Sequence, residues 1–246
     1  MGRAKEIDVR VIPSSLANPF VKRVHYSGKV VQNSQVHFGA FLDGKLHGVL
    51  SYGPSMQKSV LQGLVAGTQW NEFIELNRMA FDDYLPRNSE SFCIAKSLRL
   101  LKKNAPHLKW VVSFADGCQC GDGTIYRASN FVLTGINHNR AILELPDGSR
   151  IVNVTISAHP YSPATMHAKA VCGVPLEKKA TVSDLQRGGA KYIDGFMLRY
   201  VYFLDKRCRE KLTVPELPFS VIDEVGAGMY KGQNITQAER HAIKTE

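Results

Sequence analysis

The residues best suited to chemistry lie where several predicted elements end. Arg78 occupies the middle of an alternating segment, and Ser89 and Ser91 lie in the first turn of a predicted helix. Asp116 follows a buried apolar run, and Tyr126 lies in a short predicted helix after it. These groups suit an anionic or acyl-bearing substrate if they meet at one opening of a sheet. Structural roles stay open: Arg78 could pair with Asp116, Ser91 could cap its helix, and Tyr126 could be a core ring.

Histidines and cysteines offer further candidates. His25 follows the first predicted helix and could serve as a base, a metal ligand or a cation at the helix end. His37 and His47 flank the Asp43-Gly44 turn, and we expect them to be cross-strand neighbours rather than ligands. Cys118-Gln119-Cys120 has no second pair at zinc-finger spacing, so we expect no structural zinc site.

Composition narrows the class of protein. The 246 residues carry 31 basic and 22 acidic side chains, a formal net charge of +9 that favours a polyanionic partner. A hydrophobic content of 44% is enough for a folded core. No apolar run approaches the roughly 18 residues of a membrane span, and the N-terminus lacks the apolar segment of a signal peptide. Five cysteines do not form a disulfide scaffold, so we expect a cytoplasmic protein without a membrane partner.

Two stretches concentrate the positive charge. Residues 91–115 contain five lysines and arginines and no acid, and residues 187–211 contain seven bases and three acids. They could be ordinary solvated faces or the edges of a groove that follows phosphates. The side chains expected to contact DNA are Lys96, Arg99, Lys102, Lys103, Arg199, Lys206, Arg207 and Arg209.

The hydrophobic pattern predicts a mixed α/β fold. Strands are expected at 7–11, 36–42, 46–52, 71–81, 108–115 and 131–134. Helices are expected at 14–26, weakly at 58–66, at 88–104 and at 124–129. The helix at 88–104 bridges the fourth and fifth strands, where we expect the sheet to open and a ligand to bind.

The pattern loosens after residue 136. We therefore predict a catalytic core at 1–136 and a β-rich extension at 137–246 that packs on it and could contact DNA. Strands are expected at 141–145, 150–157 and 200–204, whereas residues 158–190 are rich in Pro, Gly and Ser and give no functional indication. The last 35 residues are predicted to form a partly ordered arm.

Long strings in the core resemble a known family. They are His25-Tyr26-Ser27-Gly28, Asn71-Glu-Phe-Ile-Glu-Leu-Asn-Arg-Met-Ala, Pro86-Arg-Asn-Ser-Glu-Ser91, Trp110-Val-Val-Ser-Phe-Ala-Asp116-Gly and Gly123-Thr-Ile-Tyr-Arg-Ala-Ser-Asn-Phe131. With them the chain resembles the Mom family of Mu-like phages over residues 20–135, and more loosely at 198–206. The resemblance implies an enzyme that adds a methylcarbamoyl (acetamido-type) group to N6 of adenine in double-stranded DNA. That mark protects phage DNA from host restriction.

The resemblance also implies roles for individual residues. Asp116 or His25 would orient or deprotonate the N6 amine, and Arg78 and Ser91 would hold the donor carbonyl. Tyr126 would stack on or hydrogen-bond the base or the donor, and Tyr26 would line the pocket. Because the amine is paired inside the duplex, the adenine would be flipped out. Iron is suggested for such proteins, and the chemically acceptable ligands are His25, Asp116 and Tyr126.

The donor is the least specified part of this hypothesis. The family is similar to GNAT acyltransferases, which implies a GNAT-like sheet and a cofactor turn at Arg87, Asn88 and Ser89. The stretch Arg87–Ser91 has no glycine and contains Glu90, which disfavours the phosphates of acetyl-coenzyme A. An aminoacyl or other activated acyl donor is therefore equally open.

Two other functions remain possible from the sequence. An ordinary GNAT-type N-acyltransferase would use acyl-coenzyme A on a small molecule or a protein. A DNA-binding module without catalysis would use the positive charge alone, and its binding would not depend on Arg78 or Asp116.

Overall fold

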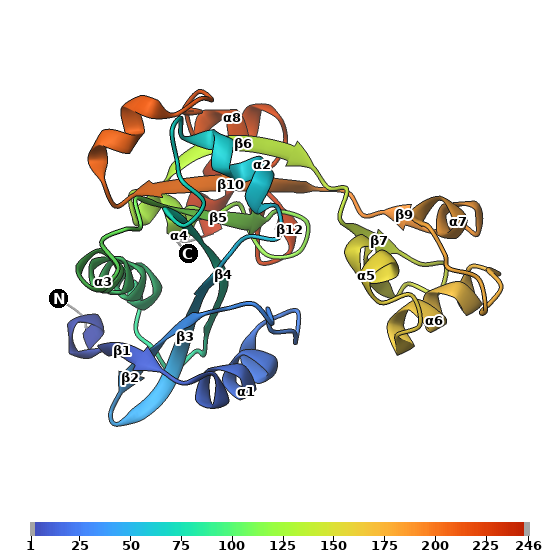
Figure 1. The fold of residues 1–246 in the computed structure, drawn as a ribbon, viewed down its shortest axis with the longest axis horizontal. Helices are drawn as coiled ribbons and strands as arrows, with labels where there is room; N and C mark the ends of the chain where they lie inside the picture. The colour runs from blue at the N-terminus through green and yellow to red at the C-terminus, as the bar shows by residue number, and fades with distance from the viewer. Residues whose placement is uncertain (1–2, 244–246) are drawn as a thin grey trace. The chain divides into compact units, whose positions relative to one another are not determined.

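The computed structural model describes residues 3–243, which form two compact units (Figure 1). The larger unit comprises residues 3–115, Asp122–Gly135 and Leu198–Glu224. The smaller unit comprises Asp116–Gly121, Ile136–Met197 and residues 225–243. The sequence places its boundary at 136, close to the break after Gly135, but the structure returns Leu198–Glu224 to the larger unit.

The main sheet has seven strands in the order β1-β2-β3-β4-β5-β10-β6. These are β1 (Asp8–Ile12), β2 (Val36–Leu42), β3 (Lys45–Gly53), β4 (Phe73–Phe81), β5 (Trp110–Asp116), β10 (Phe196–Phe203) and β6 (Val132–His138). The strands β1 to β4 pair antiparallel, and β4 and β5 pair parallel. The predicted mixed α/β sheet is therefore confirmed.

The sheet opens between β4 and β5, as predicted. Their register covers only four pairs, from Phe73 opposite Trp110 to Leu76 opposite Ser113. The hydroxyl of Ser113 donates to the carbonyl of Leu76 at 2.9 Å, at the last of these pairs. Beyond it β4 continues to Phe81 without a ladder to β5, so backbone groups of the two strands are released from each other.

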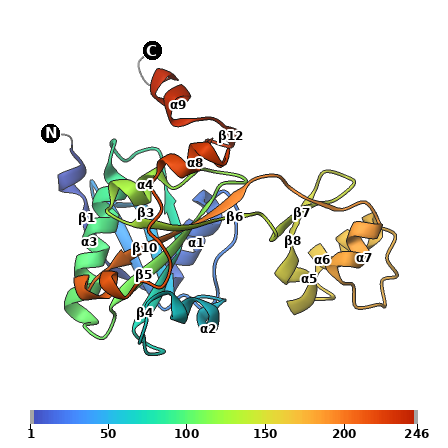
Figure 2. The ribbon, with the colours of Figure 1, turned by 90° about the horizontal axis from the view of Figure 1, so that it is seen from above.

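Helices cover both faces of this sheet. In the larger unit they are η1 (Arg3–Glu6), α1 (Ser14–Val24), α2 (Lys58–Leu61), η2 (Gln62–Leu64), α3 (Ser89–Asn104), α4 (Thr124–Ala128), η3 (Lys206–Lys211) and α8 (Ser220–Glu224). The helix α1 buries Phe20 against Val49 and Ala80, whereas Ser97 of α3 reaches Tyr52. Because Val49 and Tyr52 point to opposite faces of β3, α1 and α3 lie on opposite sides of the sheet (Figure 2).

The core includes a strand that the sequence places outside it. Trp110 is fully buried, and its ring stacks on Phe73 with centroids 4.3 Å apart. Val201 of β10 packs in the same cluster, and β10 lies between β5 and β6. The predicted strand at 200–204 is therefore an inner strand of the main sheet, which corrects its assignment to a separate extension.

The smaller unit has its own sheet and core. Its elements are β7 (Ile142–Glu144), β8 (Arg150–Val152), α5 (Asn153–Ala158), α6 (Pro163–Val171), α7 (Val182–Arg187), β9 (Lys191–Tyr192), β11 (Met229–Tyr230), β12 (Gln233–Asn234) and α9 (Gln237–Ile243). The order β8-β7-β9 forms a three-stranded sheet over a core that includes Leu143 and Leu185. The strand predicted at 150–157 is β8 followed by α5, and the Pro/Gly/Ser-rich stretch at 158–190 contains α6 and α7.

The C-terminal segment also forms regular structure where it is described. The predicted partly ordered arm, residues 212–243, carries α8, β11, β12 and α9 joined by irregular segments, and residues 244–246 lie outside the described part. None of the helices formed within residues 3–243 has the length and apolar character needed to cross a membrane.

Candidate active site

A β-bulge in β4 positions the polar residues in the middle of that strand. Ser51 of β3 lies opposite Arg78, and the next residue, Tyr52, lies opposite Leu76. Asn77 is therefore an extra residue in β4, and such an insertion bends a strand and redirects its side chains. The bulge explains why polar residues interrupt the apolar pattern of this strand next to the sheet opening.

Arg78 is fixed by the backbone around it. Its Nε donates to the carbonyl of Lys29 at 2.9 Å, and its Nη1 donates to the carbonyl of Asn77 at 2.8 Å. Burial lowers the pKa of Arg78, and the neighbouring phenol of Tyr26 and carboxyl of Glu75 act in the opposite direction. Since a guanidinium keeps its proton in proteins, Arg78 presents a permanent positive charge in a defined orientation.

Glu75 is a neighbour of Arg78 that sequence reasoning did not select. Burial raises the pKa of Glu75, while a hydrogen bond with Ser55 and the charge of Arg78 lower it. A carboxyl group with a raised pKa next to a partly buried cation is typical of sites that transfer protons. The sequence signal was an acid within a strand whose neighbours are mostly buried. We call Tyr26, Ser55, Glu75, Asn77 and Arg78 the Arg78 cluster.

The raised pKa of Glu75 predicts a pH-dependent contribution to stability. At pH values just above 4.5, the ordinary pKa of a glutamate, Glu75 keeps its proton in the folded chain and has lost it in the unfolded chain. The free energy of unfolding therefore falls as pH rises through this window. We expect Glu75→Gln, which does not titrate, to gain stability relative to wild type as pH increases. Urea unfolding of both proteins between about pH 4 and pH 8 measures this difference, and a pH-independent difference would contradict it.

The loop after α1 carries His25 and Tyr26. The Nδ1 atom of His25 accepts a hydrogen bond from the backbone N–H of Ser27 at 3.1 Å and lies 2.8 Å from the Ser27 hydroxyl oxygen. Because Nδ1 is an acceptor, the proton of the neutral ring is on Nε2, and His25 offers a donor there rather than a base. Tyr26 is 56% exposed, and its ring centroid lies 4.3 Å from that of His25.

Asp116 ends β5 and organises the loop that follows. Its carboxylate accepts hydrogen bonds from the backbone N–H of Cys118 at 3.0 Å and from Nε2 of Gln119 at 3.1 Å. Asp116 clusters with the smaller unit, whereas Arg78 and Tyr126 belong to the larger one. That Asp116 meets these two residues therefore stays a prediction.

Tyr126 is a core residue by burial. It is 7% exposed, and its ring packs against those of Phe131 and Tyr200, with centroids 5.4 and 5.2 Å away. The expectation that Tyr126 stacks on a base needs correction, since its ring is already packed between core residues. Burial raises the pKa of Tyr52, and the phenol of Tyr126 acts electrostatically in the same direction. A hydrogen-bonding role for the Tyr126 hydroxyl stays a prediction.

The three residues expected to form a cofactor turn, Arg87, Asn88 and Ser89, lie before and at the start of α3 in different environments. Asn88 has a left-handed backbone with φ +71°, a conformation that glycine adopts at lower cost. Ser89 is fully buried and its hydroxyl donates to the carbonyl of Pro86, so its assignment as a cofactor contact is corrected. Ser91 donates to the carbonyl of Asn88 at 3.1 Å, as a helix-start residue does, while also lining a pocket.

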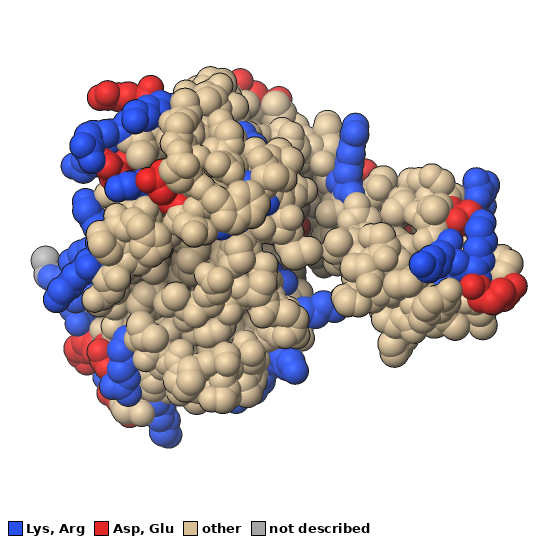
Figure 3. Space-filling model, viewed as in Figure 1, with Lys and Arg blue, Asp and Glu red and all other residues tan. Residues whose placement is uncertain are grey.

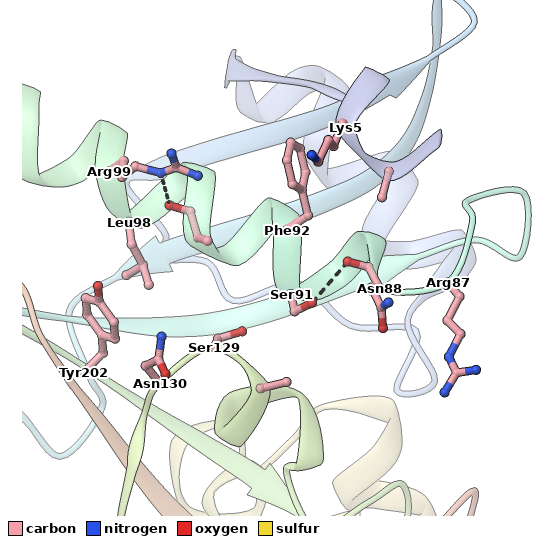
Figure 4. Close-up of a pocket in the computed structure, with 13 residues that line it drawn as sticks. Lys5, Arg87, Asn88, Ser91, Phe92, Leu98, Arg99, Ser129, Asn130 and Tyr202 are labelled. Atoms are coloured by element: carbon pink, nitrogen blue, oxygen red, sulfur yellow. Dashed lines mark hydrogen bonds between the residues drawn. The ribbon is translucent and has the colours of Figure 1, made fainter. Parts of the chain in front are cut away.

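This pocket has a volume of about 610 Å³ and lies along α3 (Figure 4). Lys5, Arg87 and Arg99 contribute its charges, and no acidic side chain lines it. Tyr202 and Asn130 lie on the side opposite Phe92 and Lys5, and Arg87 extends at one end (Figure 4). Three cations around a partly apolar pocket suit an anionic ligand that also has a hydrophobic portion.

The expected DNA-binding side chains differ in how much charge they can offer. Arg199 is corrected, because its guanidinium is partly buried and donates to the carbonyl oxygen and the hydroxyl of Thr134. Arg207 pairs with Asp205, and Arg209 pairs with Glu216, which reduces their net charge. Lys96 lies over the ring of Phe92. The exposed members without an ion pair in the described chain are Arg99, Lys102, Lys103 and Lys206.

Figure 3 shows the distribution of charge on one face. Lysine and arginine side chains gather at the margin of the larger unit, and the centre of this face is almost uncharged. The lysine and arginine side chains of this face therefore form no stripe across its centre.

The histidines on the β2–β3 hairpin have different partners from those expected. His37 lies opposite Ser51, and its Nδ1 is 2.8 Å from the Ser51 hydroxyl oxygen, while burial lowers its pKa. The Nδ1 of His47 lies 3.0 Å from a carboxylate oxygen of Asp82, and its ring stacks on Tyr84. His37 and His47 are therefore not cross-strand neighbours.

The residues proposed for iron do not form a ligand set. Across residues 3–243, no group of three or more His, Cys, Asp and Glu side chains is placed to hold a metal ion. His25 Nδ1 and both carboxylate oxygens of Asp116 already accept hydrogen bonds, and Tyr126 is packed in the core. These side chains do not fit an iron centre, and no chemical step is assigned to one.

Comparison with known proteins identifies the family. A model of the Mom protein family matches residues 6–221. The methylcarbamoylase Mom of Escherichia phage Mu is 34% identical over 213 residues, which cover 85% of this chain and 80% of that protein. The chain is thus a transferase with a mixed α/β fold. More particularly, it belongs to the Mom protein family.

Solved acetyltransferases resemble the chain only distantly. A Staphylococcus aureus N-acetyltransferase is 10% identical, with a TM-score of 0.44 over 80% of this chain and 98% of that one. The Vibrio cholerae spermidine/spermine N-acetyltransferase is 8% identical, with a TM-score of 0.45 over 85% and 99%. A GNAT family acetyltransferase of Brucella melitensis is 16% identical, with a TM-score of 0.36 over 51% and 82%. These similarities are in keeping with the predicted fold class but support no inference about substrate or cofactor.

Proposed function

We propose that this protein transfers a methylcarbamoyl group to N6 of adenine in double-stranded phage DNA and so protects that DNA from host restriction. The observation that carries the proposal is the 34% identity to the phage Mu methylcarbamoylase over 85% of the chain. Its place of action would be the cytoplasm of the host cell, where phage DNA is present.

The Arg78 cluster supplies groups suited to such a transfer. A bond forms between N6 and the transferred group, the bond to the leaving group of the donor breaks, and N6 loses a proton. In this proposal Arg78 stabilises the negative charge that develops on the donor. Asp116 takes the proton or orients the amine, while His25 donates through Nε2 and Tyr26 lines the pocket. Glu75, whose pKa burial raises, is a second group in this cluster that can exchange a proton.

The pocket along α3 is the proposed site of the activated acyl or aminoacyl donor. Its cations, Lys5, Arg87 and Arg99, would hold an anionic part of that donor, and Ser91 and Asn88 offer polar contacts. The other exposed cations, Lys102 and Lys103 of α3 and Lys206 of η3, would contact DNA phosphates. The target adenine would leave the stack to reach the site.

Nucleoside mass spectrometry of plasmid DNA tests this function. Cells would express wild type, Asp116→Ala or Asp116→Asn, and folding of each protein would be checked by thermal melting. We expect deoxyadenosine heavier by an acetamide unit with wild type, reduced by about 10²- to 10⁴-fold in both variants if Asp116 is the base. Asp116→Asn keeps an acceptor for the Cys118 N–H and removes the charge, which separates catalysis from loop structure.

A carboxylate remote in sequence provides the matched control. Asp194→Asn alters an exposed acid of the smaller unit and should leave modification unchanged. Full modification by folded Asp116→Asn would remove Asp116 from the mechanism. Unmodified DNA with every protein, in a host that supports the phage Mu enzyme, would leave an ordinary N-acyltransferase or a DNA-binding module as the function.

A further inference from the structure

A second pocket of the larger unit shares only Ser55 with the chemistry described so far. It has a volume of about 470 Å³ and lies between the end of β3, the helix α2 and the start of β4. Its lining residues are Gln35, Pro54, Ser55, Met56, Lys58, Ser59, Trp70 and Asn71. This volume is within the range of small-molecule sites, about 300–1,000 Å³.

The most unusual residue of this pocket is an exposed tryptophan. Trp70 is 52% exposed, whereas the other tryptophan of the chain, Trp110, is fully buried. The Nζ of Lys58 lies 4.7 Å from the centroid of the Trp70 ring, and Met56 beside it is 72% exposed. Trp70 and Met56 together form an exposed apolar surface, and an indole with a neighbouring ammonium suits a base and its phosphate.

The polar groups of the pocket add to this pattern. Gln35 and Asn71 contribute carboxamides, and neither has a side-chain hydrogen bond within the described residues. Carboxamides can donate and accept at adjacent atoms, which matches the N6 and N7 groups of adenine. No acidic side chain lines the pocket, so its single charge, on Lys58, favours an anion.

The pocket is also connected to the Arg78 cluster. Ser55 forms part of its wall and hydrogen-bonds to Glu75, which interacts in turn with Arg78. A ligand in the pocket would therefore lie next to Ser55 and close to its partner, the carboxyl group of Glu75.

From these contacts we propose that the Trp70 pocket binds an adenine base turned out of double-stranded DNA. The base stacks on Trp70, its edge meets the carboxamides of Gln35 and Asn71, and Lys58 contacts the adjoining phosphate. This proposal rests on the proposed function for the identity of the base. It adds the residues that would receive the base.

Binding to two duplexes tests the pocket directly. In one, a single adenine faces an abasic site and has no pairing partner; in the other, that adenine is itself replaced by an abasic site. We expect wild type to bind the unpaired adenine more tightly and its Trp70 fluorescence to be quenched. Trp70→Ala should lose this preference, with on the order of 10- to 100-fold weaker binding to the adenine duplex. Trp70→Phe, which keeps an aromatic ring, should retain part of it.

Two further variants separate base contacts from general effects. Lys58→Gln should weaken binding to both duplexes equally and reduce the salt dependence, because a phosphate contact does not read the base. Tyr161→Ala alters another exposed aromatic residue, 56% exposed and in the smaller unit, and should bind both duplexes as wild type does.

The proposal is overturned if wild type binds both duplexes equally, or if folded Trp70→Ala keeps the full preference for adenine. It is also overturned if sedimentation shows that Trp70 mediates self-association while DNA binding ignores the base. Nucleoside mass spectrometry on the same proteins distinguishes the two proposals. Modified DNA with a base-indifferent pocket would refute the Trp70 assignment alone, and base-dependent binding without modification would refute the proposed function alone.

Discussion

We expect Arg78→Met to reduce DNA modification by on the order of 10²- to 10³-fold, the effect of removing one preorganised charge from a developing anion. The guanidinium is held by the carbonyls of Lys29 and Asn77, so it does not need to reorient during the reaction. Methionine fills a similar volume without charge or donors. The measurement is the rate at which modified deoxyadenosine accumulates in plasmid DNA, with folding checked by thermal melting.

Two control variants, one conservative and one remote, show whether the loss of modification rate is due to the charge and geometry of Arg78. Arg78→Lys keeps the charge but has a single donor centre, so it should recover only part of the rate. Arg140→Met removes an exposed arginine of the smaller unit and should modify DNA normally. If folded Arg78→Met retained more than about half of the wild-type rate, Arg78 would have no electrostatic role of this size.

The largest expected loss of stability is at Trp110. We expect Trp110→Ala to lower the free energy of unfolding by about 3–5 kcal/mol, the usual cost of deleting a buried aromatic side chain. Trp110 is fully buried, stacks on Phe73 and donates from Nε1 to the hydroxyl of Thr68 at 3.1 Å. It also forms the first pair of the β4–β5 ladder, opposite Phe73. Urea denaturation followed by far-UV circular dichroism measures the change.

The second tryptophan provides the internal comparison. Trp70 is half-exposed, so Trp70→Ala should change the free energy of unfolding by about 0.5 kcal/mol or less, as surface substitutions usually do. Equal losses for the two variants would show that Trp110 does not anchor the core.

Much of the larger unit could be predicted because its elements follow simple patterns. The predicted helix at 88–104 is α3, and its apolar stripe, which includes Ile94 and Leu98, is buried. The nearly continuous apolar run at 108–115 is β5, buried on both faces of the sheet. In such segments the burial pattern repeats with the period of the element, which a sequence displays directly.

The smaller unit was harder to predict because its helices are short. Residues 150–157 contain valine, isoleucine and threonine, which favour a strand, yet the chain changes from β8 to α5 after Val152. Signals of helix starts were present. Ser162 caps α6, and Thr181 and Asp184 form a reciprocal capping box at the start of α7.

In the candidate site, too, some residues could be recognised from the sequence and others only from the fold. Arg78 was recognisable as a charge within a strand, whereas the importance of Glu75 depends on burial, which only the fold defines. Ser89 and Ser91 look equivalent in sequence. They lie on different sides of the first turn of α3, so Ser89 is in the core and Ser91 is at the pocket. Arg199 looked like a surface charge, and its bonds to Thr134 depend on strand pairing between distant segments.

The position of β10 has a consequence for the order of assembly. The chain leaves the main sheet after β6 and returns as β10, its neighbour in that sheet, with residues 139–195 between them. At the junction, the backbone N–H of Asn139 donates to the carbonyl of Gly195 at 2.9 Å, so this excursion begins and ends at one point.

During synthesis β6 therefore emerges before the strand that joins it to β5. A long unstructured excursion would make closure of the sheet entropically costly, and the cost grows with loop length. Once the contiguous part of the smaller unit has folded around Leu143 and Leu185, the two ends are already together. The folded smaller unit therefore shortens the effective loop, and β10, the last strand of the main sheet to be synthesised, inserts between β5 and β6.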